Sequence, residues 1–228
     1  MNFRPVYAVF VAGGNGTRMG GDVPKQFLEL GGIPVLQRSV ERFLEAEPSA
    51  RVITVLPQQH ISTWQELCVR YAVSFPQTIV AGGMTRFHSV LAALAKVPDG
   101  AIVAIHDGVR PLMTASLVRR MLDEMSAADG PEALIPVVPV IDTLRSTDPG
   151  IPAPDRSRLV AVQTPQMFLS EVLKAAYRQP YDVSFTDDAS VVERAGVRVC
   201  TSPGERFNIK ITTPEDYKLA QLLLSPSL

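Results

Sequence analysis

The chain has 228 residues, and its 22 lysines and arginines almost balance its 23 aspartates and glutamates, giving a formal net charge of −1. That balance argues against a protein that wraps nucleic acid over a broad basic surface, while it still allows a small basic site. The hydrophobic fraction of 46% argues against disorder. The length favours a single domain over residues 1–228.

The cysteines and the N-terminal sequence bear on where the protein works. Cys68 and Cys200 are the only cysteines, and two distant cysteines form neither a disulfide framework nor a metal cluster. A reduced, cytoplasmic protein is therefore expected. The apolar run Val6–Ala12 is far shorter than the ~20 residues that cross a membrane. It could pass for a minimal signal peptide, but it leads directly into a glycine-rich loop, which favours a buried strand.

Short β-rich runs alternate with amphipathic stretches along the chain. The runs are mostly continuous apolar segments, which is typical of strands buried on both faces of a sheet. We expect strands at Val6–Ala12, Arg51–Pro57, Thr78–Ala81, Ala101–Ile105 and Ala133–Val140. Their alternation with helices predicts an α/β fold with an open, mostly parallel sheet. Ligands bind such sheets at the carboxyl ends of the strands.

The helical stretches each present an apolar face. Hydrophobic side chains recur at helical spacing within Leu36–Phe43 and again within Val90–Val97. A further helix should begin near the C-terminus, where Thr213 can cap it and Pro214 suits its first position. Thr186 is also a candidate N-cap, because two aspartates follow it.

Residues 139–158 depart from this pattern. The segment contains four prolines, mixed charges and little apolar periodicity. Long excursions from a compact domain tend to be functional or disordered. Two interpretations stay open from the residues alone: a solvated loop or hairpin, and an arm that contacts a partner subunit.

The first predicted strand leads into a glycine-rich loop, Ala12–Lys25. Such a loop can bring backbone amides close to a phosphate chain. The dinucleotide fingerprint G-x-G-x-x-G fails because Met19 occupies its third glycine position, and a Walker A loop fails because Asp22 stands where lysine is required. Arg18 and Lys25 place two cations beside the loop. We therefore predict a polyphosphate site here in preference to a plain turn.

The loop and several later segments carry an ordered set of motifs. In chain order these are A-G-G-x-G-T-R-M at 12–19, P-K-Q-F at 24–27, G-G-x-x-R-x-x-S-V at 82–90, H-D-G-V-R-P at 106–111, D-T at 142–143, Q-T-P-Q at 163–166, T-D-D-A-S at 186–190 and N-I-K at 208–210. The set resembles that of the cytidylyltransferases that act on polyol phosphates, over nearly the whole chain. The resemblance implies an open, Rossmann-like twisted sheet of the nucleotide-diphospho-sugar transferase type, flanked by helices. It also implies a protruding β-arm, residues 139–158, that joins two chains in a homodimer.

The resemblance further implies roles for individual residues. It implies that the catalytic cations, which hold the triphosphate, are Arg18, Lys25 and Lys210. It implies that the nucleotide-binding residues are Ala12, Gly13, Gly14, Gly16, Gly83, Arg86 and Ser89. For the polyol phosphate it implies Asp107, Arg110, Thr164 and Thr186, with Thr143 and Arg156 completing the site of the partner subunit.

Two roles remain open for Asp107. It could bind a Mg²⁺ ion that bridges the CTP phosphates, or it could accept a hydrogen bond from a hydroxyl of the polyol. Arg110 would then contact the substrate phosphate or brace Asp107. His106 is interpreted as a structural histidine and not as an acid or base. Gly83 would allow close approach of the base, or would serve a turn.

The resemblance implies transfer of CMP from CTP to 2-C-methyl-D-erythritol 4-phosphate, a step of non-mevalonate isoprenoid biosynthesis, with release of pyrophosphate. Chemistry of this kind needs alignment and charge stabilisation more than a covalent nucleophile. Ribitol 5-phosphate is the alternative acceptor, and Thr186–Ser190 and the Asp155-Arg156 pair favour methylerythritol phosphate. A non-catalytic nucleotide-binding module is the second alternative. Neither nucleic acid nor a membrane is an expected partner.

Overall fold

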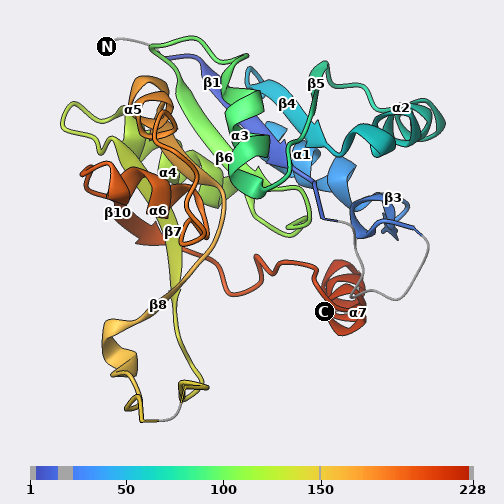
Figure 1. Ribbon diagram of the computed structural model, residues 1–228. Helices are drawn as coiled ribbons and strands as arrows, with labels where there is room; N and C mark the ends of the chain where they lie inside the picture. The colour runs from blue at the N-terminus through green and yellow to red at the C-terminus, as the bar shows by residue number, and fades with distance from the viewer. Residues whose placement is uncertain (1–3, 15–22, 149, 226–228) are drawn as a thin grey trace.

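The computed structural model describes residues 4–14, 23–148 and 150–225, and an eight-stranded sheet runs through its middle (Figure 1). The strands follow the order β10-β7-β9-β6-β1-β4-β5, with β8 paired to β7. Their bounds are β1 Val6–Val11, β4 Arg51–Leu56, β5 Gln77–Ala81, β6 Ile102–Asp107, β7 Ala133–Pro139, β8 Val160–Val162, β9 Gln166–Leu169 and β10 Cys200–Pro203. A separate hairpin is formed by β2 (Glu29–Leu30) and β3 (Ile33–Pro34).

Helices lie on both faces of this sheet. Their bounds are α1 Val35–Leu44, α2 Ile61–Arg70, α3 Arg86–Leu94, α4 Ala115–Ser126, α5 Ser170–Ala176, α6 Asp188–Arg194 and α7 Pro214–Leu224. Single 3₁₀ turns occur at Lys25–Phe27, Gln58–His60 and Arg156–Arg158. Within the described ranges, none of the helices combines the length and the apolar character needed to cross a membrane.

The pairing of the strands confirms the open, mostly parallel sheet. β1 pairs in parallel with both β4 and β6, β5 pairs in parallel with β4, and β10 pairs in parallel with β7. All five predicted strands are present, with ends that differ by one or two residues. Sequence periodicity did not predict β8, β9 or β10. Of these, β9 runs antiparallel between β6 and β7.

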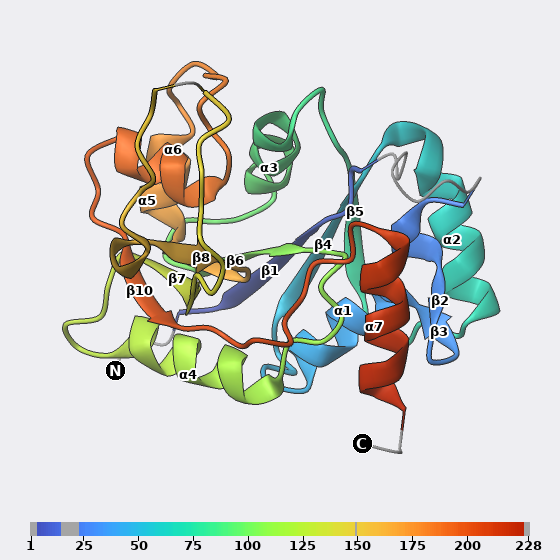
Figure 2. The same ribbon diagram turned by 90° about the horizontal axis from the view of Figure 1, so that it is seen from below.

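Strand β1 is buried on both faces, as its continuous apolar sequence predicts. Val6, Ala8 and Phe10 pack into the cluster that contains α1 and α4, and Tyr7 and Val9 pack into the cluster that contains α3, α5 and α6. The alternation follows from the two-residue period of a strand. Figure 2 shows the same division, with α1 and α4 on one side of the sheet and α3, α5 and α6 on the other.

The register of the central strands positions the site. β6 continues to Asp107, two residues beyond the predicted end at Ile105, so that His106 and Asp107 belong to the strand. Val11, the last residue of β1, is the register partner of Asp107. The glycine-rich loop therefore leaves β1 beside Asp107, at the carboxyl edge where parallel sheets bind ligands.

The sequence signal for the start of the C-terminal helix is confirmed. Thr213 caps α7 through a capping box with Asp216, and Pro214 is its first residue. Helix α3 ends at Leu94, before the last residue of the predicted apolar stretch. The predicted cap at Thr186 is wrong, because α6 begins one residue later and Asp187 accepts the capping hydrogen bond from the Ser190 amide. An aspartate side chain caps as well as a threonine side chain, so the sequence did not distinguish the two.

The arm, residues 139–158, leaves the sheet at the end of β7 and returns into β8, and Figure 1 shows it extending away from the rest of the chain. Only its base is paired, through the antiparallel contacts of Val137 with Val162 and of Pro139 with Val160. Farther out, Arg156 donates a hydrogen bond to the carbonyl oxygen of Ile141 and links the two sides of the arm. The predicted β-arm is thus a short two-stranded base with a largely irregular outer part, apart from residue 149, which lies outside the described ranges.

Glu171, at the start of α5, supports a prediction about stability in acid. Arg4 contacts its carboxylate at 2.7 Å, and the Gly100 amide donates to it at 3.2 Å. Burial opposes ionisation of Glu171, but the hydrogen bonds it accepts outweigh burial and lower its pKa from 4.5 to about 2. The folded state therefore gains stability from the charged form above pH 4.5, and that gain is lost as the pH falls toward 2.

We expect Glu171→Gln to lower the melting temperature most at pH 7 and progressively less as the pH approaches 3. Thermal unfolding followed by circular dichroism at pH 7, 5 and 3 measures the difference from the wild type. Glu66→Gln, at an exposed position of α2, is the control for loss of a surface carboxylate. A difference that stays constant over this pH range would contradict the prediction.

Candidate active site

Asp107 lies at the carboxyl end of β6 and is contacted by two cations. Arg110 Nε and Lys210 Nζ each lie 3.1 Å from its Oδ2 atom. Burial disfavours the charged carboxylate, but Lys210, Arg86 and Arg110 together outweigh burial and hold the pKa of Asp107 well below its usual range. Asp107 is consequently an anion that orders a cluster of positive charge.

Lys210 reaches this cluster because the segment before it is attached to the turn after β6. Arg110 Nη1 donates to the carbonyl oxygen of Asn208 at 2.8 Å, and the Ile211 amide donates to the carbonyl oxygen of Val109 at 2.9 Å. These two bonds lie on either side of Lys210 in the chain. They fix the backbone of the N-I-K motif against the H-D-G-V-R-P motif.

His106 precedes Asp107 in β6, and its side chain is buried and hydrogen-bonded within the protein. It is completely buried, and burial lowers its pKa to about 4, so the ring is neutral at pH 7. Its Nε2 atom faces the carbonyl oxygen of Arg110 at 3.2 Å, which only accepts, and its Nδ1 atom lies 2.9 Å from Thr164 Oγ1. Nε2 therefore carries the proton and Thr164 donates to Nδ1.

Thr164 links His106 to the backbone of Asp107. Its Oγ1 atom accepts a hydrogen bond from the Asp107 amide at 3.1 Å while donating its own proton to His106. The hydroxyl proton of Thr164 is thereby engaged within the protein. Toward a substrate, Thr164 can act as an acceptor of hydrogen bonds.

A pocket of about 330 Å³ opens beside Asp107, between the loop after β1 and the start of α3. It gathers most of the predicted nucleotide-binding positions and two of the predicted cations. It is lined by Val11, Ala12, Gly13, Gly14, Lys25, Gln26, Gly83, Met84, Thr85, Arg86, Ser89, Asp107, Val109 and Lys210. The predicted residues Gly16 and Arg18 lie outside the described ranges.

The start of α3 forms one wall of this pocket and depends on two small residues. A Cβ atom on Gly83 would lie 2.4 Å from the Cβ of His88, so glycine is required here by packing within the chain. Ser89 Oγ accepts from the Gly83 amide at 3.2 Å and donates to the Thr85 carbonyl oxygen at 2.9 Å. Ser89 therefore lines the pocket and also fixes the shape of this wall.

A second pocket of about 270 Å³ adjoins the first. Its lining consists of Arg86, Asp107, Arg110, Val162, Gln163, Thr164, Gln166, Thr186, Asp187 and Lys210. Three charged residues, Arg86, Asp107 and Lys210, line both pockets. Two anionic molecules bound side by side would thus meet at a shared wall that carries two cations and one carboxylate.

Comparison with known proteins identifies the family. A sequence profile described as 2-C-methyl-D-erythritol 4-phosphate cytidylyltransferase matches residues 6–226. A protein of that name from Porphyromonas gingivalis is 50% identical over 222 residues, which are 96% of this chain and 97% of the relative. Another from Phocaeicola vulgatus is 46% identical over 219 residues, covering 96% of this chain and 99% of the relative.

The chain belongs to the 2-C-methyl-D-erythritol 4-phosphate cytidylyltransferase family. It is therefore a nucleotidyltransferase of the cytidylyltransferase type, as its motifs indicated.

Solved structures of this cytidylyltransferase family share the fold. 4-Diphosphocytidyl-2C-methyl-D-erythritol synthase from Anaerococcus prevotii superposes with a TM-score of 0.79 at 27% identity, covering 97% of this chain and 96% of that one. The 2-C-methyl-D-erythritol 4-phosphate cytidylyltransferase from Thermus thermophilus gives a TM-score of 0.74 at 29% identity, over 96% and 98% of the two chains. The comparisons confirm the predicted fold class.

The arm residues of this family member do not join the site within one chain. Thr143 and Arg156 are both exposed on the arm, and in the described part of the chain neither lines either pocket. Thr186, by contrast, lines the second pocket, together with Thr164 and Arg110.

Sequence reasoning overlooked Gln26, which the cytidylyltransferase places in the wall of the first pocket. Gln26 is completely buried, and its Nε2 atom donates to the carbonyl oxygen of Ala12 at 3.0 Å. Among the residues that the structure describes, none forms a hydrogen bond with its Oε1 atom. One signal could have identified Gln26: it lies directly between Lys25 and Phe27, which is buried. A polar side chain at such a position is tolerated when it is hydrogen-bonded.

Proposed function

We propose that this enzyme transfers CMP from CTP to 2-C-methyl-D-erythritol 4-phosphate. The observation that carries the proposal is the pair of adjoining pockets that share Arg86, Asp107 and Lys210. The pocket bounded by the glycine-rich loop would take CTP, and the pocket bounded by Thr164 and Thr186 would take the polyol phosphate. Relatives named for this substrate match the chain over nearly its whole length.

The reaction would be an in-line displacement at the α-phosphorus of CTP. A phosphate oxygen of the acceptor forms a bond to that phosphorus, and the bond to the bridging oxygen of pyrophosphate breaks, so that pyrophosphate leaves with the electron pair. Because both reactants are anions, the protein must hold them together against repulsion. Lys25 and Lys210, with Arg18, supply the positive charge that stabilises the α-phosphate as its charge grows.

The cations differ in what they contribute. Lys210 is about half exposed and borders both pockets, so it can contact the oxygens on the reacting phosphorus. Arg110 is nearly buried and directs Nε to Asp107 and Nη1 to Asn208. We assign Arg110 mainly to bracing Asp107, and Lys210 to the charge that develops during transfer.

A divalent cation forms part of this proposal, in keeping with the dependence of the family on such ions. Mg²⁺ on a nucleotide needs one or two carboxylates in addition to phosphate oxygens and water. Asp107 supplies one carboxylate where the two pockets meet, which fits that need. When bound, the ion would neutralise part of the triphosphate charge. Among the described residues, no group of three or more His, Cys, Asp or Glu side chains could enclose a metal independently of the substrate.

The activity is tested with CTP, Mg²⁺ and equal amounts of the two candidate acceptors. We expect release of pyrophosphate and formation of 4-diphosphocytidyl-2-C-methyl-D-erythritol in preference to CDP-ribitol, both resolved by chromatography. If neither acceptor gives a product, cytidylyl transfer is refuted. A preference for ribitol 5-phosphate would refute the assignment of the acceptor.

The homodimer is also part of the proposal. Thr143 and Arg156 are exposed on an arm that extends away from the rest of the chain, and this placement suits contacts with a second chain. In such a dimer each acceptor site would use Lys210 from one chain and Arg156 from the other.

We expect Arg156→Ala and Lys210→Ala to be nearly inactive alone and to complement each other when mixed. Random exchange of subunits makes half of the dimers mixed, and each mixed dimer has one intact site, so about a quarter of the wild-type activity should return. Pyrophosphate release after unfolding and joint refolding measures this. Arg158→Ala, in the same turn of the arm, is the control. A mixture no more active than the average of the two separate variants would contradict exchange of arms.

A further inference from the structure

A buried ion pair connects Arg86, at the start of α3, to Asp188, the first residue of α6. Arg86 Nη2 lies 2.5 Å from Asp188 Oδ2, and the two residues are 102 positions apart in sequence. The Asp188 side chain is completely buried, whereas that of Arg86 retains 26% of its exposure. Arg86 is thus the partly exposed member of the pair, and it lines both pockets.

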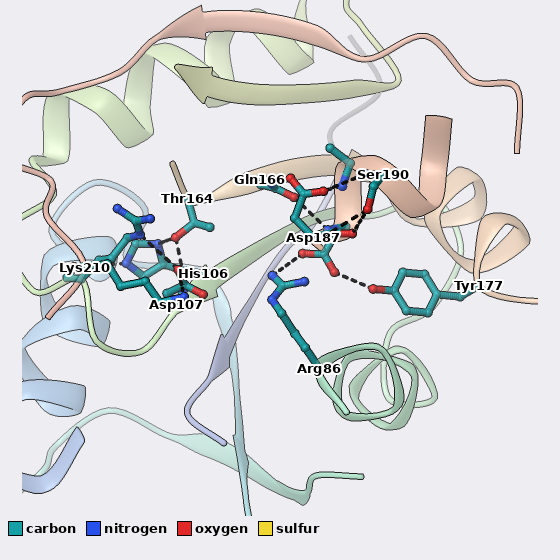
Figure 3. A network of polar contacts seen from close by, with 12 residues as sticks. Arg86, His106, Asp107, Thr164, Gln166, Tyr177, Asp187, Ser190 and Lys210 are labelled. Atoms are coloured by element: carbon teal, nitrogen blue, oxygen red, sulfur yellow. Dashed lines mark hydrogen bonds and ion pairs between the residues drawn. The ribbon is translucent and has the colours of Figure 1, made fainter. Parts of the chain in front are cut away.

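Asp188 is held in turn by a second donor. Tyr177 Oη donates to its Oδ1 atom at 2.6 Å, and Tyr177 is itself only 2% exposed. Burial and the neighbouring carboxylate raise the pKa of Tyr177 well above its usual value, so the phenol keeps its proton. In Figure 3, Tyr177 and Arg86 point toward one another, and dashed lines mark the contact that each makes with Asp188.

The backbone of Asp188 is fixed as well. The amides of Asp188 and Ala189 both donate to Gln166 Oε1 at 3.1 Å, and Gln166 Nε2 donates to Asp187 at 2.7 Å. Gln166 belongs to β9, in the interior of the sheet. The position of the Arg86 guanidinium is therefore set by the sheet, through α6.

Stability alone gives a weak reason for this arrangement. Removing charges from water is costly, and a buried ion pair can often be replaced by apolar side chains without loss of stability. An arginine whose guanidinium forms planar, forked contacts with phosphate has a clear use where two phosphate groups must meet. The ion pair engages Nη2 of Arg86, and a guanidinium has five N–H donors in all.

We propose that Asp188 and Tyr177 are positioning residues, which hold the Arg86 guanidinium at the shared wall of the two pockets so that it contacts phosphate groups of both substrates. This inference rests on the proposed function. Asp188 and Tyr177 act through Arg86 and touch neither substrate. A specific consequence is that loosening them weakens the use of CTP and of the acceptor together.

The first test is Tyr177→Phe, which removes one hydroxyl and keeps the ring. We expect KM to rise about fivefold for both substrates, the size associated with one buried hydrogen bond, while the melting temperature stays within a few degrees of the wild type. Tyr181→Phe is the matched control, because Tyr181 packs against Phe87 in the same aromatic cluster and is 41% exposed. The control should leave both KM values unchanged.

The second test asks whether Asp188 acts through Arg86. We expect Asp188→Asn to lower kcat/KM for each substrate by about thirtyfold, and Arg86→Gln to lower it at least as much. In the double variant the effects should not add, because the two residues form one unit. Asp182→Asn, which removes a partly exposed carboxylate 3.6 Å from Arg194 of α6, is the control and should keep full activity.

The outcomes separate this inference from the proposed function. A wild-type enzyme that makes no product refutes the proposed function. If the wild type is active, unchanged KM values in Tyr177→Phe overturn the positioning role, as do additive effects of Asp188→Asn and Arg86→Gln. If Asp188→Asn does not fold, the KM values of Tyr177→Phe decide the matter, since that variant keeps the charge pair intact.

Discussion

Lys210→Ala should lower kcat by about two to three orders of magnitude, which is the usual loss when a preorganised group that stabilises transition-state charge is removed. Lys210 Nζ is held 3.1 Å from Asp107 and borders both pockets, so it stands where charge would develop on the transferred phosphate. The side chain is 44% exposed. Its truncation should therefore leave the fold intact.

The measurement is steady-state release of pyrophosphate with CTP and the acceptor varied separately. Lys218→Ala, at an exposed position of α7, is the control for loss of a lysine near the C-terminus. Lys210→Arg should recover part of kcat, because the charge is kept although its geometry changes. If kcat is unchanged in Lys210→Ala and only KM for CTP rises, Lys210 binds substrate equally in the ground state and the transition state, and the assignment is wrong.

Asp107→Asn should lower kcat/KM by at least about a hundredfold, because it disrupts a preorganised charged site while keeping the size of the side chain. The carboxylate orders Arg110 and Lys210, which both contact Oδ2. Without its charge, these two cations and Arg86 repel one another across the shared wall. The melting temperature should fall as well, since a buried charge cluster loses its counter-ion.

Titration with Mg²⁺ distinguishes the two roles of Asp107. If it binds the ion, raising Mg²⁺ above the concentration that saturates the wild type should restore part of the activity of Asp107→Asn. If it only orders Arg110 and Lys210, extra Mg²⁺ has no effect. Asp99→Asn is the control, because Asp99 also pairs with a lysine, Lys174 at 2.7 Å, but is 72% exposed. If Asp107→Asn keeps full activity at every Mg²⁺ concentration, Asp107 has neither of these roles.

Long apolar runs made much of the sheet predictable. β1, β4 and β6 are each six residues long and consist mostly of hydrophobic residues, so a strand buried on both faces is their simplest interpretation. β9 has four residues and runs directly into α5, which leaves little periodicity to read. Its antiparallel direction depends on the path of the arm, which no local pattern encodes.

Part of the candidate site was likewise predictable from the sequence, and part was not. Lys25, Asp107 and Lys210 occur in motifs, and the fold brings these residues around one pocket as the family resemblance implied. The contribution of Tyr177 could not be predicted, because it arises only when α5 and α6 pack together and bring its hydroxyl to Asp188. Thr186 gave a misleading cap signal because the next residue can cap equally well.

The position of Lys210 in the chain has a consequence for synthesis. Lys210 lies on the segment that crosses from β10 to α7, after every strand of the sheet has been made. A ribosome-bound chain that ends before this segment already contains the glycine-rich loop and Asp107, but not the lysine that contacts Asp107. Transfer chemistry that depends on Lys210 would therefore begin only after this segment has been synthesised.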